Sequence, residues 1–146
     1  MDHSSRLPTA MTAPRIRRLP PPLRPLIDKF YRGHRSPMRS QAGDELWVAE
    51  RGSEIIAALG LRPLADGQWL TGLFVAPNER GQGLATRLVQ GSLAVHPEPV
   101  WLFCHPDLAP LYRRMGFADC PGLPQTLAER LARYQRSKSL IALRAH

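Results

Sequence analysis

The sequence lacks long apolar runs, clustered cysteines and an apolar N-terminal segment, and each absence removes a class of protein. No apolar stretch among the 146 residues approaches the roughly 20 residues that are needed to span a bilayer. Residues 1–22 contain no continuous apolar segment, so we expect no secretory signal. Cys104 and Cys120 fit no metal-ligand spacing and are too few for a disulfide framework. We therefore expect a cytoplasmic protein that has no membrane partner and binds no metal.

The composition and the charge indicate one globular domain with a basic arm. Hydrophobic residues make up 43% of the chain and charged residues 22%, which is ordinary for a globular protein. Residues 1–39 hold nine basic and two acidic side chains, whereas the remainder holds eleven and ten. The nearly neutral charge of the residues after 39 argues against nucleic acid as the main partner. We predict a flexible Pro- and Arg-rich arm over residues 1–22 and a folded domain over 23–146.

Alternating strand and helix patterns predict an α/β or α+β fold. Two apolar runs flank the turn around Ser53 and predict a hairpin. Two helix starts are expected from capping residues, one at Asp107 and one in a capping box formed by Thr126 and Glu129. Gly116 is a natural stop for the first of these helices. The predicted strands are 45–50, 55–64, 69–75, 100–104 and 139–144, and the other predicted helices cover 25–32 and the stretch from Leu84 onward.

Residues 78–86, NERGQGLAT, lie between a predicted strand and a predicted helix. The first N–H groups of such a helix have no intrahelical partners and, with the helix dipole, favour a phosphate-type anion. Gly81 and Gly83 allow the backbone to approach that anion closely. The stretch contains neither a Walker A motif nor the GxGxxG fingerprint. Taken alone, a turn of this kind is more often a structural connection than a ligand site.

Two motifs in this order resemble the signature of the GNAT superfamily of N-acetyltransferases. Arg80-x-x-Gly83-x-Ala85 follows the strand residues LeuPheVal at 73–75 and is similar to the turn that wraps the pyrophosphate of acetyl-CoA in that family. LeuTyrArgArgMetGlyPhe at 111–117 is similar to the family's downstream helix and strand. The resemblance covers roughly residues 23–145. It implies a mixed central sheet of about six to seven strands flanked by helices, with a splayed V between the fourth and fifth strands.

The resemblance also implies the residues that bind the co-substrate. Strand backbone at Leu73 and Val75 would hold the pantetheine arm as an added strand would, and an N–H at or near Val75 would polarise the thioester carbonyl. The turn would bind the pyrophosphate. The implied acetyl-CoA-binding residues are Leu73, Phe74, Val75, Arg80, Gly81, Gln82, Gly83, Leu84, Ala85 and Thr86.

For the chemistry, the resemblance implies direct attack by a primary amine, with Tyr112 protonating or hydrogen-bonding the departing thiolate. The sequence departs from the family's pattern in two places. Strand 69–75 contains no carboxylate to act as general base, which leaves His105, His34, Glu45 and Asp66 as candidates. We favour His105, because it should lie at the mouth of the V and can titrate near neutral pH.

The second departure is a helix between the last two strands, where many members have a hairpin loop. Its basic residues Arg130, Arg133 and Arg136 either form a solvated face or line the pocket of an acidic acceptor.

These patterns together predict an acetyl-CoA-dependent N-acetyltransferase. Two alternatives stay open: a non-catalytic GNAT-fold regulatory or CoA-binding module, and an RNA- or ribosome-associated protein that acts through its basic arm. The sequence leaves undecided whether the chain forms a homodimer and which amine it acetylates.

Overall fold

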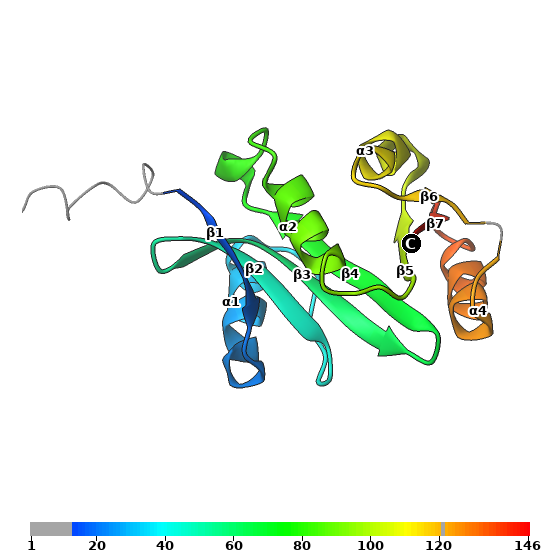
Figure 1. Ribbon diagram of the computed structural model, residues 1–146, viewed down its shortest axis with the longest axis horizontal. Helices are drawn as coiled ribbons and strands as arrows, with labels where there is room; N and C mark the ends of the chain where they lie inside the picture. Colours follow the sequence, from blue (N-terminus) through cyan, green and yellow to red (C-terminus); the bar gives the residue numbers. More distant parts are fainter. Residues whose placement is uncertain (1–12, 121) are drawn as a thin grey trace, which may run out of the picture.

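The computed structural model describes residues 13–120 and 122–146, whose strands form one mixed sheet in the order β1-β2-β3-β4-β5-β7-β6 (Figure 1). No helix in these ranges is long and apolar enough to cross a membrane. The strands are β1 (Arg15–Leu19), β2 (Glu45–Arg51), β3 (Glu54–Leu64), β4 (Gly67–Val75), β5 (Val100–Cys104), β6 (Ala118–Asp119) and β7 (Ile141–Ala145). The helices are α1 (Arg24–Gly33), α2 (Leu84–Leu93), α3 (Ala109–Arg114) and α4 (Gln125–Tyr134), with short 3₁₀ turns η3 (Pro21–Leu23), η4 (Pro77–Glu79) and η5 (Pro106–Leu108).

Helices cover both faces of the sheet, and the strands therefore read as nearly continuous apolar runs. In β2, Trp47 and Ala49 pack on the face covered by α2, whereas Leu46 and Val48 pack on the face covered by α1. Ala109, Leu111 and Tyr112 of α3 pack on the same core cluster as the apolar residues of α2. Helix α4 places Leu127 against a smaller cluster on the opposite face. The predicted mixed sheet of six to seven strands with flanking helices is confirmed.

Strand β1 corrects the predicted arm. The arm was expected to be flexible over residues 1–22, but Arg15–Leu19 forms an edge strand antiparallel to β2. Sequence reasoning missed this strand because it has only two apolar residues among three arginines. Its charges are compensated in the sheet, since Arg17 donates to Glu50 over 2.7 Å and Arg18 lies 3.4 Å from Glu45. Charged side chains are typical of a protected sheet edge. Residues 1–12 lie outside the described residues, and the arm stays a prediction there.

Strands β4 and β5 are parallel neighbours over only two residue pairs. Gln68 is paired with Val100 and Trp69 with Trp101, and beyond these pairs the two strands diverge. The remainder of β4 keeps its antiparallel partner β3 on one side and has no strand partner on the other. The splayed V between the fourth and fifth strands is confirmed, and its open end lies toward Val75 and Cys104.

The predicted helix caps are wrong, although the helices are correct. Asp107 caps no helix with its side chain; instead the Nδ1 atom of His105 accepts from the Asp107 amide over 3.1 Å and begins η5. Helix α4 begins after Pro124 and has no side-chain cap, so Thr126 and Glu129 form no capping box. Pro124 supplies the turn into the helix through its fixed φ, and no polar side chain is needed for that role.

Candidate active site

One cavity of about 460 Å³ lies where β4 ends and α2 begins. Nine of the ten residues predicted to bind acetyl-CoA line it: Leu73, Phe74, Val75, Arg80, Gly81, Gly83, Leu84, Ala85 and Thr86. The tenth, Gln82, points elsewhere, and its side-chain oxygen lies 3.5 Å from the Arg51 guanidinium. We call this space the turn cavity.

The backbone of the turn leaves amide donors without helical partners in residues that line this cavity. Gly81 and Gly83 have φ values of +80° and +77°, a left-handed conformation that other residues adopt at a cost. A Cβ added at either position would meet no atom within 4 Å. The first helical bond runs from the Arg87 amide to the Gly83 carbonyl over 3.0 Å, so the amides before Arg87 lack intrahelical partners. The arrangement suits an anionic group at the helix N-terminus.

Beneath the turn lies a buried ion pair that the sequence analysis missed. Arg51 in β2 donates to Glu79 over 2.8 Å, and both side chains are nearly inaccessible. Glu79 also lines the turn cavity. Its partner lies far away in the sequence, so only the β2–β3–β4 pairing brings Arg51 under the turn.

Arg80 occupies the outer edge of the same turn. Its Nε donates to the Val75 carbonyl over 3.0 Å, and its guanidinium lies 5.3 Å from the centroid of the Phe74 ring. The Val75 carbonyl, one of the strand groups expected near a pantetheine arm, therefore already accepts a hydrogen bond. The exposed guanidinium places a positive charge at the entrance of the turn cavity.

A second cavity of about 290 Å³ occupies the open end of the V and contains both predicted catalytic residues, Tyr112 and His105. It shares Leu73 and Leu108 with the turn cavity, so the two spaces adjoin. We call it the V cavity. Leu108, which is exposed despite its apolar side chain, lies at the junction of the two cavities and was not predicted.

Tyr112 projects from α3 among apolar neighbours. Its ring lies edge-on to Phe117 at 6.0 Å between centroids. Burial, with a smaller contribution from the Cys104 thiol, raises the pKa of Tyr112 to about 12. The hydroxyl therefore stays protonated at neutral pH and is able to donate a hydrogen bond. Burial likewise raises the pKa of Cys104, so this buried thiol is poorly suited to act as a nucleophile.

His105 is the only one of the four proposed bases that lines the V cavity in the described part of the chain. Its Nδ1 lone pair accepts the Asp107 amide, and in the neutral ring the proton is then on Nε2. Acting as a base would require breaking this contact. His34 packs beside Phe74, and Asp66 lies in the turn before β4, at the paired end of the V.

A β-bulge in β4 shapes the floor of the V cavity. Two residues, Gly72 and Leu73, face one residue of β3, and Gly72 has a φ of +68°. The hydroxyl of Tyr31 in α1 donates to the Gly72 carbonyl over 2.6 Å. Burial, together with nearby Asp28 and Asp44, raises the pKa of Tyr31, so this phenol stays a donor. Neither the bulge nor its tyrosine was predicted, because the contact spans 41 residues.

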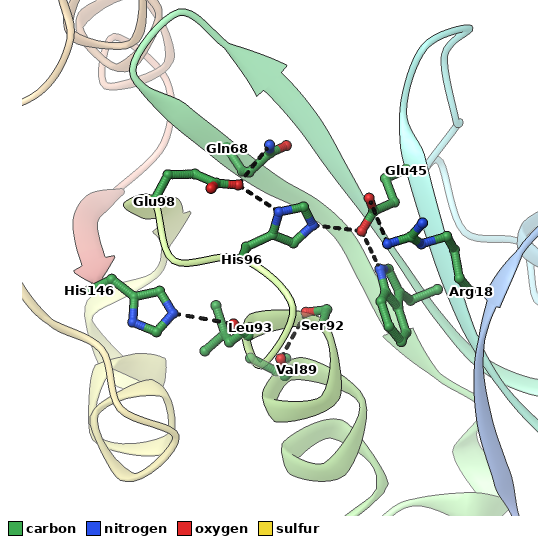
Figure 2. Close-up of polar contacts among 10 residues, drawn as sticks. Arg18, Glu45, Gln68, Val89, Ser92, Leu93, His96, Glu98 and His146 are labelled. Carbon is green, nitrogen blue, oxygen red and sulfur yellow. Dashed lines mark hydrogen bonds and ion pairs between the residues drawn. The ribbon is translucent and has the colours of Figure 1, made fainter.

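The paired end of the V contains a polar network centred on His96 (Figure 2). Its Nε2 lies 2.7 Å from Glu45 and its Nδ1 lies 2.6 Å from Glu98. Trp47 also donates to Glu45, and Gln68 donates to Glu98. Burial opposes the charged imidazole, but the hydrogen bonds to the two carboxylates outweigh it and raise the pKa of His96. Glu45 is thus occupied here, away from the V cavity.

The chain belongs to the GNAT acetyltransferase family, because residues 42–119 match the profile of the acetyltransferase (GNAT) domain. This segment runs from the loop before β2 to β6. It includes every residue that lines the turn cavity, and all that line the V cavity except Met38 and Leu140. No curated protein matches the sequence.

Solved structures with the same fold include three of particular interest. The IAA acetyltransferase from Bacillus cereus superposes with a TM-score of 0.67 at 15% identity, over 91% of this chain and 99% of that one. A GNAT acetyltransferase from Elizabethkingia anophelis with acetyl-CoA bound gives 0.60 at 14% identity, over 91% and 97%. N-acetylglutamate synthase from Neisseria gonorrhoeae, complexed with coenzyme A and N-acetyl-glutamate, gives 0.65 at 16% identity, over 92% and 35%. This chain therefore spans about a third of that synthase. At these identities the likeness shows the fold alone.

Proposed function

We propose that this chain is an N-acetyltransferase that moves the acetyl group of acetyl-CoA to a primary amine by direct attack in a ternary complex. The observation that carries the proposal is the junction of the turn cavity with the V cavity at Leu73 and Leu108. It joins a helix N-terminus suited to an anion to a space that is lined by the half-buried Tyr112. A phosphate-bearing thioester could thus be bound at one end and react at the other.

The binding roles follow from charge and from backbone donors. The free amides at the start of α2 and the Arg80 guanidinium would bind the pyrophosphate. Arg51 neutralises Glu79 beneath the turn, so this buried carboxylate does not repel the anion. The unpaired edge of β4 beyond Trp69 would hold the pantetheine arm by strand addition.

In the transfer step, the amine nitrogen bonds to the acetyl carbon as the carbon–sulfur bond breaks. The nitrogen loses a proton to a base or to water, and the sulfur leaves with the electron pair of the broken bond. Tyr112, whose pKa is about 12, would stabilise the thiolate by donating a hydrogen bond. A thiol pKa of about 8.5 makes complete transfer of the phenolic proton uphill, so water would finally protonate the sulfur.

Tyr112→Phe tests this role while keeping the ring and its packing. We expect kcat to fall about 100-fold, at the lower end of the range for acid–base assistance, with coenzyme A affinity unchanged. The measurement is thiol release from acetyl-CoA with a broad amine panel, alongside calorimetry with coenzyme A. Equal kcat in wild type and variant would exclude a catalytic role for the Tyr112 hydroxyl. Coenzyme A binding without thiol release for any amine would instead favour the non-catalytic module.

His105→Gln tests the predicted base in the same assay. If the imidazole accepts the proton of the amine, kcat should fall about 100-fold in the variant, with coenzyme A affinity unchanged. An unchanged kcat in His105→Gln would leave deprotonation to water.

A further inference from the structure

The region beyond the V cavity contains a third space that the proposed chemistry does not yet use. It is a groove of about 500 Å³ lying between the loop after α1 and the segment around α4, with β4 and β5 as its floor. Its walls include Met38, Trp69, Phe103, Tyr134 and Leu140. Met38, Phe103 and Leu140 also line the V cavity, so the groove opens onto the position proposed for the reaction. We call it the acceptor groove.

Aromatic rings dominate this groove. Trp69 and Phe103 lie 5.4 Å apart between centroids, and Phe103 meets Tyr134 edge-on at 6.3 Å. The three rings come from β4, β5 and α4, so α4 completes a wall that the sheet alone would leave open. Rings arranged in this way favour a flat or branched apolar group. A volume of this size is within the range for small-molecule sites.

The charge lining the groove is of one sign. Lys138 is the single ionised side chain among the described residues that line it, and no aspartate or glutamate lines either the groove or the V cavity. The Lys138 ammonium lies 5.6 Å from the Tyr134 centroid and forms no ion pair with any described residue. A second ammonium on the acceptor would meet no counterion here, whereas a carboxylate would meet Lys138 on its flexible stem.

We propose that the acceptor groove binds an apolar α-amino acid with a large side chain, whose α-amine is the group acetylated. This inference rests on the proposed function and names its substrate class. The side chain packs against the rings of Phe103 and Tyr134, the α-carboxylate pairs with Lys138, and the α-amine faces the V cavity. Of the basic residues predicted to line an acceptor pocket, Arg133 and Arg136 are exposed outside the groove, and Arg130 stacks on Trp69 at 4.8 Å.

The test compares acceptors that differ by one group. L-Phenylalanine and phenethylamine share a ring and an amine, and only the first carries a carboxylate; L-glutamate and spermidine test anionic and polycationic alternatives. Thiol release at saturating acetyl-CoA gives kcat/KM for each acceptor. We expect L-phenylalanine to exceed phenethylamine about tenfold, as one partly exposed charge-assisted bond supports. Glutamate and spermidine should react more slowly still.

Two variants separate the carboxylate contact from the aromatic one. Lys138→Gln should lower kcat/KM for L-phenylalanine about tenfold through KM and leave phenethylamine unchanged. Tyr134→Ser should weaken both acceptors. Arg136→Gln removes an exposed cation two residues from Lys138 and serves as the matched control, with no effect on either acceptor.

The failures of the two proposals are distinguishable. Faster turnover of spermidine or glutamate than of L-phenylalanine, or equal loss for phenethylamine in Lys138→Gln, would overturn the acceptor assignment and leave the transferase intact. If no amine releases thiol although coenzyme A binds, the proposed function fails. Calorimetry of L-phenylalanine with the coenzyme A complex then tests whether the acceptor groove binds this amino acid. An absence of binding overturns the acceptor assignment.

Discussion

The two ends of the β4–β5 junction are built from the same pair of strands and have opposite characters. At the paired end, His96 lies between two carboxylates and the strands are hydrogen-bonded. At the open end, a bulge at Gly72 and an apolar cavity replace the pairing. Polar contacts and strand pairing hold β4 and β5 together at one end, whereas at the other end this edge of β4 has no strand partner.

The largest effect is expected from the bulge that opens the V. A Cβ at Gly72 would lie 2.7 Å from the Tyr31 hydroxyl, and its φ of +68° disfavours any L side chain. Gly72→Ala should therefore lower the free energy of unfolding by about 3 kcal/mol, from left-handed strain and overpacking together. Denaturant unfolding measures this loss.

A second substitution measures how much of that loss comes from the contact between the added Cβ and the Tyr31 hydroxyl. Tyr31→Phe removes the hydroxyl, so the double variant should be more stable than the sum of the two single effects predicts. Strict additivity would contradict the close approach and leave backbone strain as the whole cause.

The second-largest effect is expected in the turn between β4 and α2, which lies outside the two ends of the V. Gly83→Asp should weaken coenzyme A binding about 30-fold, because it places a negative charge beside the proposed pyrophosphate site. Gly83→Asn is the matched control, since asparagine has the same shape, tolerates the left-handed conformation and carries no charge. Calorimetry with coenzyme A compares the two variants. Equal affinities in the two variants would contradict the proposal that the pyrophosphate binds at this turn.

The smallest effect is expected at the paired end and depends on pH. Because folding raises the pKa of His96, its ion pairs stabilise the fold fully below about pH 6.5, the ordinary pKa, and this contribution disappears as the pH rises through the folded-state value. His96→Gln should cost about 1 kcal/mol at pH 6 and less at pH 8.5. Unfolding curves at both pH values measure the difference. A cost that grows with pH would reverse the assigned sign.

The sequence predicted the strands and motifs that surround the V, but it did not predict the bulge at the open end of the V. Its apolar runs at β4 and β5 are long enough to indicate buried strands, and the two motifs at 80–85 and 111–117 identified the family. Those motifs are local, since each residue acts through a turn or helix that its own neighbours form. The bulge could not be predicted, because a glycine within a strand has several uses and Tyr31 reaches it only after α1 packs on the sheet. Strand β1 was missed for a related reason, since its arginines are acceptable in a strand only once Glu50 and Glu45 face them.

Local chemistry therefore determined by itself the order of the four helices and of strands β2 to β5 and β7, the glycines of the turn and the position of Tyr112 on a helix. Periodicity and turn preferences act over a few residues, and a sequence shows them directly. Only the tertiary structure decided that Tyr112 and His105 line one cavity, that Arg51 neutralises Glu79, and that Tyr134 at the end of α4 and Lys138 beyond it line a groove. Each of these depends on which strands pair and how far they splay, and that outcome is set by packing between residues that lie far apart in the chain.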